Sequence, residues 1–130
     1  SLHGLPKETY TELEHPLQQA VRKAVADVTG VASEDMGWGI DGCSAPNYAV
    51  ALSRLALGYA RLAAGSASPV GGTSLARLSQ AMRSHPDLVS GSGRNDEAFM
   101  RIGRGDWVSK VGADGVQAIS VGEISVRLQR

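Results

Sequence analysis

Lys110 is the residue with the clearest chemical potential, because the chain otherwise uses arginine for its positive charge. After Lys23 there are nine arginines and a single lysine. A lysine amine can lose its proton when it is removed from water and then act as a base, whereas an arginine guanidinium stays protonated. Lys110 lies on a β-prone run that meets a Gly-rich turn. We therefore expect Lys110 to line a pocket; the alternative is a solvated strand lysine without a chemical role.

Cys43 is a second candidate, in the segment of residues 41–46 that joins a predicted strand to a predicted helix. Such turns often carry reactive groups, but a lone cysteine is usually a small buried apolar residue. A cysteine nucleophile needs an activating base, and His15 and His85 are distant in the sequence. No Cys/His cluster has the spacing of a zinc site. Cys43 could therefore supply at most one ligand of a metal site that other residues complete.

Arg94 and Asp96 follow the Gly-rich loop of residues 90–93. An arginine and an aspartate two residues apart can orient the carboxylate and the amine of an amino-acid substrate. The alternative is a helix start in which Asp96 and Glu97 complement the helix dipole. No serine in the chain has a lysine three residues later, and no G-x-S-x-G or P-loop is present.

Composition excludes several classes of protein. The chain has 130 residues and a formal net charge of zero, which predicts about one domain and gives no indication of nucleic acid or an anionic membrane as a partner. No apolar run is long enough to span a bilayer, and the N-terminus lacks the pattern of a signal peptide. A single cysteine excludes an internal disulfide framework, so we expect a cytoplasmic protein.

The order of the predicted elements favours an α+β fold. Helical spacing begins at Pro16 and stops at Gly30, and a short strand over 37–42 leads into a turn. A longer helix is expected from Pro46, another from Thr73 to before Pro86, and a short one over 94–101. Inward-facing positions are expected at Leu17, Val21, Ala24, Val25 and Val28 in the first helix and at Leu75, Leu78, Ala81 and Met82 in the third. Residues 1–105 are thus mainly helical, and 106–130 read as strands at 107–108, 116–119 and 124–128 that form an antiparallel meander.

Four segments taken together resemble the bacterial asparaginase II family. They are Glu14-His15-Pro16-Leu17-Gln18, Asp41-Gly42-Cys43-Ser44-Ala45-Pro46, His85-Pro86-Asp87-Leu88-Val89-Ser90-Gly91 with Arg94 and Asp96, and Lys110-Val111-Gly112-Ala113-Asp114-Gly115. The resemblance implies the fold of serine β-lactamases and glutaminases and the hydrolysis of L-asparagine to L-aspartate and ammonia. It also implies nucleophilic chemistry by Ser and Lys pairs and a zinc site with two Cys and one Lys as ligands.

Carried over to this chain, the resemblance assigns three residues. Cys43 matches a metal ligand, Asp41 an acidic residue beside the metal site, and Lys110 the lysine opposite the nucleophilic serine. The Ser-x-x-Lys of the family and its other metal ligands have no match in the chain. We therefore expect one domain over residues 1–130 that is part of a larger site, completed by a missing N-terminal segment or by a second copy in a homo-oligomer, and inactive alone. The open alternative is a non-catalytic α+β module that binds or oligomerises.

Overall fold

The computed structural model describes residues 4–113 and 115–122, and its helices and strands confirm an α+β protein. The chain divides into two compact units, residues 1–58 and 59–130. The helices are α1 (Pro16–Thr29), α2 (Leu52–Ala64), α3 (Gly72–Ser84), α4 (Asp87–Ser90) and α5 (Asn95–Ile102), with 3-10 turns at Ser33–Asp35 and Gly65–Ala67. The strands are β1 (Gly37–Ile40), β2 (Pro46–Ala49), β3 (Trp107–Val111) and β4 (Gln117–Val121). No helix in the described ranges is both long and apolar enough to cross a membrane.

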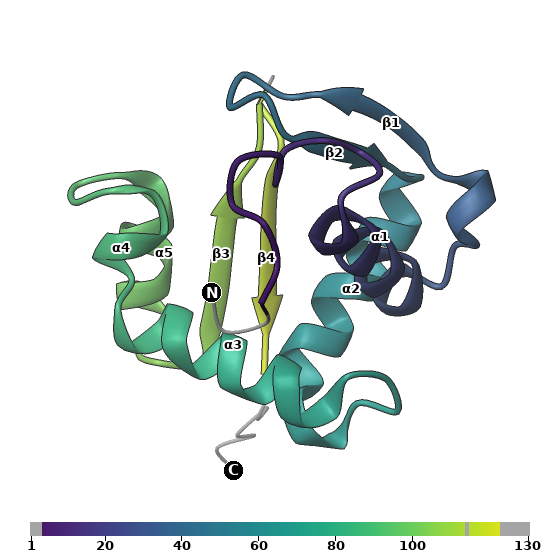
Figure 1. Ribbon diagram of the computed structural model, residues 1–130. Helices are drawn as coiled ribbons and strands as arrows, with labels where there is room; N and C mark the ends of the chain where they lie inside the picture. The colour runs from purple at the N-terminus through teal and green to yellow at the C-terminus, as the bar shows by residue number, and fades with distance from the viewer. Residues whose placement is uncertain (1–3, 114, 123–130) are drawn as a thin grey trace, which may run out of the picture. The chain divides into compact units, whose positions relative to one another are not determined.

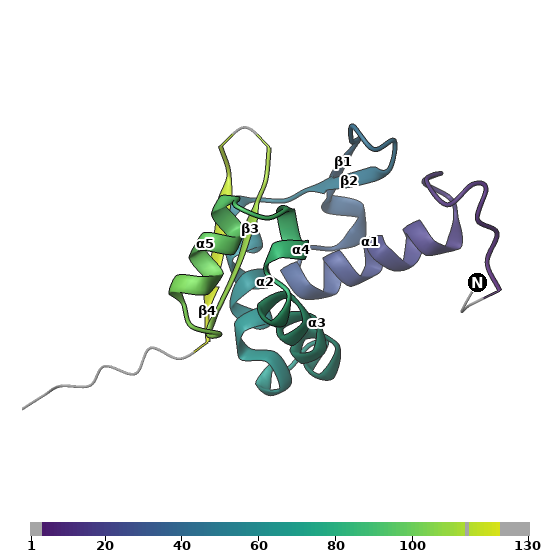
Figure 2. The same ribbon diagram turned by 90° about the vertical axis from the view of Figure 1, so that its left-hand side faces the viewer.

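Local signals set both ends of α1, as predicted. Pro16 occupies the first turn, where its missing N–H has no partner to lose. The His15 side chain caps the helix by accepting a hydrogen bond from the Leu17 N–H at 3.1 Å. Gly30 ends the helix with a φ of 66°, and its N–H donates to the Ala26 carbonyl. Figure 2 shows α1 and the β1–β2 hairpin in side view.

The expected burial of α1 is wrong in part. Leu17 and Val21 are more than a third exposed, at 38% and 39%, whereas Gln18 and Thr29 are buried. Both buried polar groups have partners: Gln18 Nε2 donates to the Tyr10 carbonyl at 2.8 Å and Thr29 Oγ1 to the Val25 carbonyl at 2.7 Å. Because a hydrogen-bonded polar group can be buried at little cost, apolar spacing alone did not identify the inner face.

The helix predicted from Pro46 is wrong, because this proline begins strand β2. Residues 46–49 pair antiparallel with 40–37, which places Tyr48 opposite Trp38. The intervening turn is closed by hydrogen bonds between the Asp41 N–H and the Ala45 carbonyl and between the Ser44 N–H and the Asp41 carbonyl. Cross-strand pairing of aromatic residues outweighs the preference of proline for a helix start. The helix itself begins later, at Leu52.

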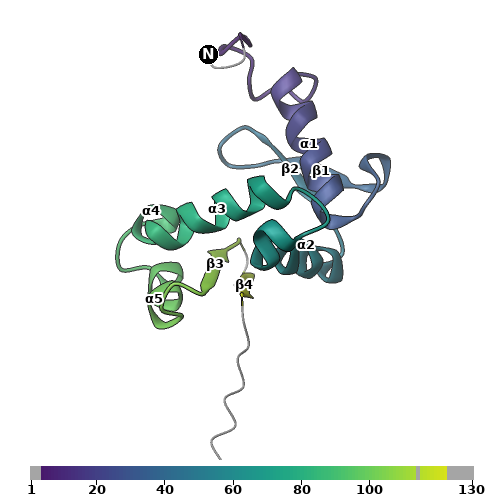
Figure 3. The same cartoon turned by 90° about the horizontal axis from the view of Figure 1, so that it is seen from below.

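In residues 59–130, β3 lies between β4 and α5, and α3 runs across this hairpin (Figures 1 and 3). Strands β3 and β4 pair antiparallel from Trp107 opposite Val121 to Val111 opposite Gln117. The predicted strands at 107–108 and 116–119 are thus confirmed, as are α3 and α5. The short helix α4 was not expected. The predicted strand at 124–128 and the turn residue Asp114 lie outside the described residues.

The core of this unit is small. Its most buried apolar side chains are Val108 at 1% exposure, Met100 at 3%, and Leu62 and Leu75 at 8% each. Leu78, predicted to face inward, is 51% exposed. Among the described residues of this unit, the buried apolar core is therefore formed by Val108 and by one side chain each from α2, α3 and α5. Lost packing at any of these positions will therefore be felt across the unit.

Gly103 gives a test of this packing. A Cβ at this position would overlap the Cγ and Cβ atoms of Trp107, although the φ of −69° suits any residue. We expect Gly103→Ala to lower the free energy of unfolding by about 1–3 kcal/mol, as overpacked sites do. Urea denaturation followed by Trp fluorescence measures it. Gly39→Ala is the control, because its Cβ meets nothing within 4 Å; equal losses in the two variants would contradict the steric explanation.

Candidate functional site

Lys110 lies on β3, half-buried, and lines an open pocket of about 430 Å³. The other lining residues come from α3, α4 and the loop between them: Ala81, Met82, His85, Leu88 and Val89. The Lys110 amine donates a hydrogen bond to the Val111 carbonyl at 2.7 Å. The expectation that this lysine lines a pocket therefore agrees with the structure, and its catalytic role stays a prediction.

The chemistry of this pocket is mixed. Two side chains on its wall can carry positive charge, Lys110 and His85, and the remaining walls are apolar. Such a surface suits a small ligand that combines an anionic or strongly polar group with a short aliphatic part. Amide and carboxylate oxygens are both acceptors for a lysine ammonium. The pocket can therefore accept a small polar or anionic ligand that carries a short aliphatic part.

Asp96, near the start of α5, is fully buried at 0% exposure, and hydrogen bonds reach both of its carboxylate oxygens. The Ser109 hydroxyl donates to Oδ1 at 2.9 Å, the Val111 N–H donates to Oδ2 at 3.0 Å, and Gln117 Nε2 donates to Oδ1 at 2.8 Å. Gln117 Nε2 also donates to Ser109 Oγ at 2.8 Å. This group of side chains, Asp96, Ser109 and Gln117, is called the Asp96 cluster below. It joins α5 to both strands of the hairpin.

The charge on Asp96 is stabilised by its donors. Burial alone would raise the pKa of this carboxyl, but the hydrogen bonds from Val111, Gln117 and Ser109 outweigh burial and hold the pKa below its usual value of 3.8. The pKa of Tyr59 is raised, first by burial and then by the negative charge of Asp96. Asp96 is therefore ionised at neutral pH.

Arg94 and Asp96 do not form a joint binding surface. Arg94 is exposed beside an open hollow of about 210 Å³ that Asn95 and Val111 also line. Asp96 is enclosed and cannot touch a ligand in this conformation. The predicted substrate contact of Arg94 stays a prediction, whereas the geometry of Asp96 favours a role in holding β3.

Cys43 and Asp41 lie in the turn between β1 and β2, and the Cys43 thiol is exposed. The Asp41 carboxylate accepts a hydrogen bond from the Gly42 N–H and so shapes the turn. The segment therefore joins two strands, and its expected place between a strand and a helix is wrong. Across the described ranges, no three His, Cys, Asp or Glu side chains gather in a way that could hold a metal ion.

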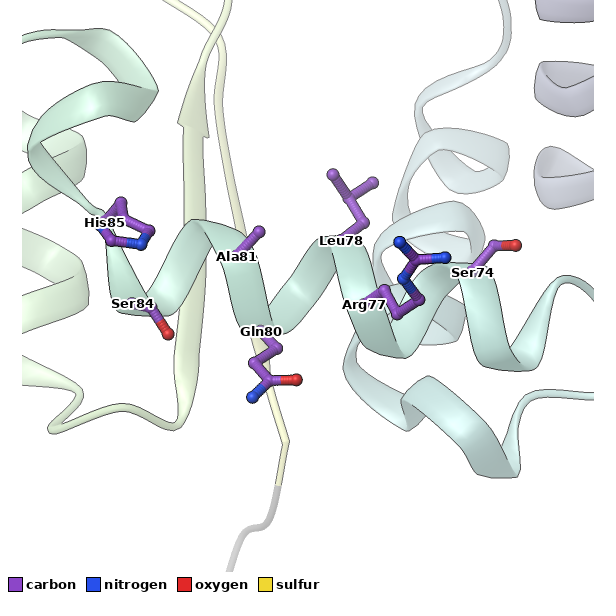
Figure 4. Close-up of a pocket in the computed structure, with 7 residues that line it drawn as sticks. All are labelled: Ser74, Arg77, Leu78, Gln80, Ala81, Ser84 and His85. Carbon is purple, nitrogen blue, oxygen red and sulfur yellow. The ribbon is translucent and has the colours of Figure 1, made fainter. Parts of the chain in front are cut away.

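A larger hollow of about 630 Å³ runs along α3 and shares Ala81 and His85 with the Lys110 pocket. Figure 4 shows its lining side chains spread along this one helix, from Ser74 at one end to His85 at the other. A wall made of one helix cannot surround a ligand, so its size does not make it the better site. We place the candidate site at Lys110, which the hollow adjoins.

The sequence did not reveal the Asp96 cluster as a unit. The sequence links Asp96 to Arg94 or, at a helix start, to Glu97, while Ser109 and Gln117 fit ordinary strand residues. The partners lie 13 and 21 residues from Asp96 in sequence, so no local pattern joins them. The available signal was Ser109 itself, between Val108 and Lys110 on a strand, because a serine hydroxyl that is buried needs a hydrogen-bond partner.

Comparison with known protein families gives one result. The family model described as L-asparaginase II matches residues 1–128. A search of curated proteins finds no match to the chain. The matched range includes Lys110, its pocket and the Asp96 cluster.

Proposed function

Because this chain belongs to the L-asparaginase II family, we propose that it forms the lysine side of an amide-hydrolysing site that acts on L-asparagine. The observation that carries this proposal is the position of Lys110 on the wall of a pocket with His85. A family match over nearly the whole chain implies hydrolysis of a C–N amide bond. The pocket offers a ligand of that kind a basic end and an apolar wall.

Lys110 has the role of a base in this proposal. Hydrolysis of an amide requires a nucleophile, a group that removes its proton, and donors for the oxyanion that develops on the carbonyl oxygen. A lysine amine that has lost its proton can take the proton of a serine hydroxyl when the two lie within hydrogen-bond reach. His85, on the same pocket wall, can bind the substrate carboxylate.

The nucleophile comes from outside these residues in this proposal. No serine in the 130 residues has a lysine three positions later. Ser109 adjoins Lys110, but its hydroxyl donates a hydrogen bond to Asp96. In addition, neighbouring side chains on a strand point to opposite faces, so Ser109 does not face the Lys110 amine. We propose that another segment or chain, in a complex or homo-oligomer, brings the serine to the Lys110 pocket.

Zinc does not enter this mechanism. The family resemblance implies a zinc site, and Cys43 is the matched ligand. The described residues give Cys43 no two further His, Cys, Asp or Glu partners, and a zinc ion requires three or four protein ligands. The described residues therefore do not fit a zinc site by themselves, and no step is assigned to the metal.

Exposed apolar side chains favour a second candidate function, a binding or oligomerising module without catalysis. Leu88 is 77% exposed, Leu52 74% and Ile102 67%. Each of these exposed apolar side chains can pack against a partner chain, as apolar residues do in the core of an interface. Sedimentation tests the self-association part of this candidate: a stable monomer at micromolar concentration would exclude it, whereas binding of L-asparagine at the Lys110 pocket would favour the first candidate.

The test of the first candidate is L-asparagine binding to the pure chain, followed by NMR shifts of backbone amides. We expect shifts at Met82, Val89 and Lys110, and a loss of affinity of about fivefold in Lys110→Ala, because this change removes a hydrogen-bonding group from the pocket wall. Lys23→Ala is the control, because Lys23 is exposed and lies on α1. Absence of shifts at the pocket would refute the proposal.

Ammonia release supplies a second measurement on the same samples. The isolated chain is expected to release none from L-asparagine, because it lacks a placed nucleophile. Robust turnover that survives Lys110→Ala would refute both the missing-nucleophile argument and the role of Lys110. Turnover abolished by Cys43→Ser would instead indicate a cysteine mechanism.

A further inference from the structure

We propose that Asp96 is a positioning residue for Lys110: it holds the main chain on both sides of the lysine and so fixes where the amine enters the pocket. This inference rests on the proposed function, because it assigns Asp96 a task within the same site. It differs from the substrate contact that the sequence suggested, since a fully buried carboxylate acts only through its neighbours.

The two oxygens of one carboxylate bind the residues before and after Lys110. Ser109 Oγ donates to Oδ1 at 2.9 Å and the Val111 N–H donates to Oδ2 at 3.0 Å. Because successive side chains on a strand project to opposite faces, Ser109 and Lys110 point away from each other. Asp96 therefore holds the strand from one face, while the pocket uses the lysine on the other.

Val111 connects Asp96 to the lysine amine directly. Its N–H is held by Asp96 Oδ2, and its carbonyl accepts the hydrogen bond of Lys110 Nζ at 2.7 Å. A shift of Val111 would therefore move both the Lys110 main chain and the acceptor that orients its amine. The carboxylate controls the position of the amine through one intervening residue.

Gln117 fixes the same geometry from β4. It lies opposite Val111 in the strand register, and its Nε2 donates to Asp96 Oδ1 and to Ser109 Oγ, each at 2.8 Å. Strand β4 and helix α5 are thereby tied to the segment 109–111 through a single buried carboxylate. A buried network in which each member has a partner is rigid, because any displacement leaves a polar group unsatisfied.

The chain allows a direct readout of this role, because it has three lysines, Lys7, Lys23 and Lys110. Reductive methylation with ¹³C-formaldehyde places ¹³C-methyl groups on these lysine amines and on the N-terminal amine. The NMR signal that is absent from Lys110→Arg belongs to Lys110. In the wild-type chain we expect the chemical shift of the Lys110 methyl groups to differ from those of Lys7 and Lys23. We also expect the Lys110 amine to be methylated more slowly than these two amines. In Asp96→Asn the signal should move toward those of Lys7 and Lys23, with a several-fold faster reaction.

A control separates positioning from stability. Leu62→Ala removes a buried side chain of α2 and should lower stability by a similar amount while leaving the Lys110 signal in place. If Asp96→Asn does not fold, the Lys110 signal is measured in Ser109→Ala instead, because this change removes one hydrogen-bond donor of the cluster and keeps the Asp96 carboxylate. An unchanged Lys110 signal in a folded Asp96→Asn or Ser109→Ala chain overturns the proposal.

The same samples separate this inference from the proposed function. If the wild-type chain does not bind L-asparagine but Asp96→Asn shifts the Lys110 signal, the positioning of the amine is supported and the proposed function is refuted. Binding of L-asparagine that is unchanged in a folded Asp96→Asn, with an unmoved Lys110 signal, supports the function and refutes the positioning.

Discussion

Lys110→Arg is expected to lower kcat for ammonia release by about 10²- to 10⁴-fold, the usual contribution of a positioned acid or base. The measurement combines this chain with a segment that carries Ser-x-x-Lys and uses L-asparagine as substrate. Arginine keeps a positive charge and the ability to donate hydrogen bonds, but it cannot give up its proton at the pH of the assay. The substitution therefore removes the base and retains the charge.

Lys23→Arg is the matched control, and its rate should equal that of the wild-type protein. Lys23 is 74% exposed and pairs with Asp27 on the surface of α1, so arginine replaces it without a change in the pocket. A Lys110→Arg protein that kept its rate within about twofold would show that charge suffices at this position. Proton transfer by Lys110 would then be wrong, although the pocket assignment would remain.

Asp96→Asn is expected to lower the free energy of unfolding at pH 7 by about 3 kcal/mol. The carboxylate takes hydrogen bonds from three groups, and hydrogen bonds to a charged partner contribute about 1.5–3 kcal/mol each in isolation, with incomplete additivity. Asparagine replaces one accepting oxygen with an NH₂ group that faces a donor. Urea denaturation of both proteins measures the difference, and Asp27→Asn, at an exposed ion pair, should lose less than about 1 kcal/mol.

The pH dependence of this difference has a defined sign. The pKa of Asp96 is lower in the folded chain than its usual value of 3.8. The stability that the carboxylate contributes is therefore complete above that value and is lost as the pH falls through the lower folded-state pKa. The gap between wild type and Asp96→Asn should be constant from pH 5 to 7 and should narrow in acid below about pH 4. A gap that widens in acid would contradict the assignment.

Local signals predicted the elements whose ends depend on a single residue. Pro16 and Gly30 bound α1, and the break before Pro86 ends α3, because proline and glycine act within one helical turn. At Pro46 the same reasoning failed. Its strand depends on pairing with residues 37–40 across a turn, and such pairing cannot be read from the residues on one side alone.

The site divides in the same way. The rarity of Lys110 is a property of the sequence itself, whereas no sequence pattern predicts that His85 lines the same pocket. The burial of Asp96 could not be predicted, because it follows from partners on β3 and β4 that the fold brings to α5. The hollow along α3 was also unforeseen, since it depends on Leu78 facing outward.

The hydrogen bond from Lys110 Nζ to the Val111 carbonyl at 2.7 Å uses only part of the donor capacity of this amine. A lysine ammonium has three N–H donors, so a ligand can accept a hydrogen bond from Lys110 while the bond to Val111 remains. The main chain therefore restrains the long lysine side chain before a ligand arrives, which reduces the entropy that is lost on binding; ordering such a side chain costs about 0.5–1.5 kcal/mol. Loss of this restraint should weaken binding without removing any contact to the ligand.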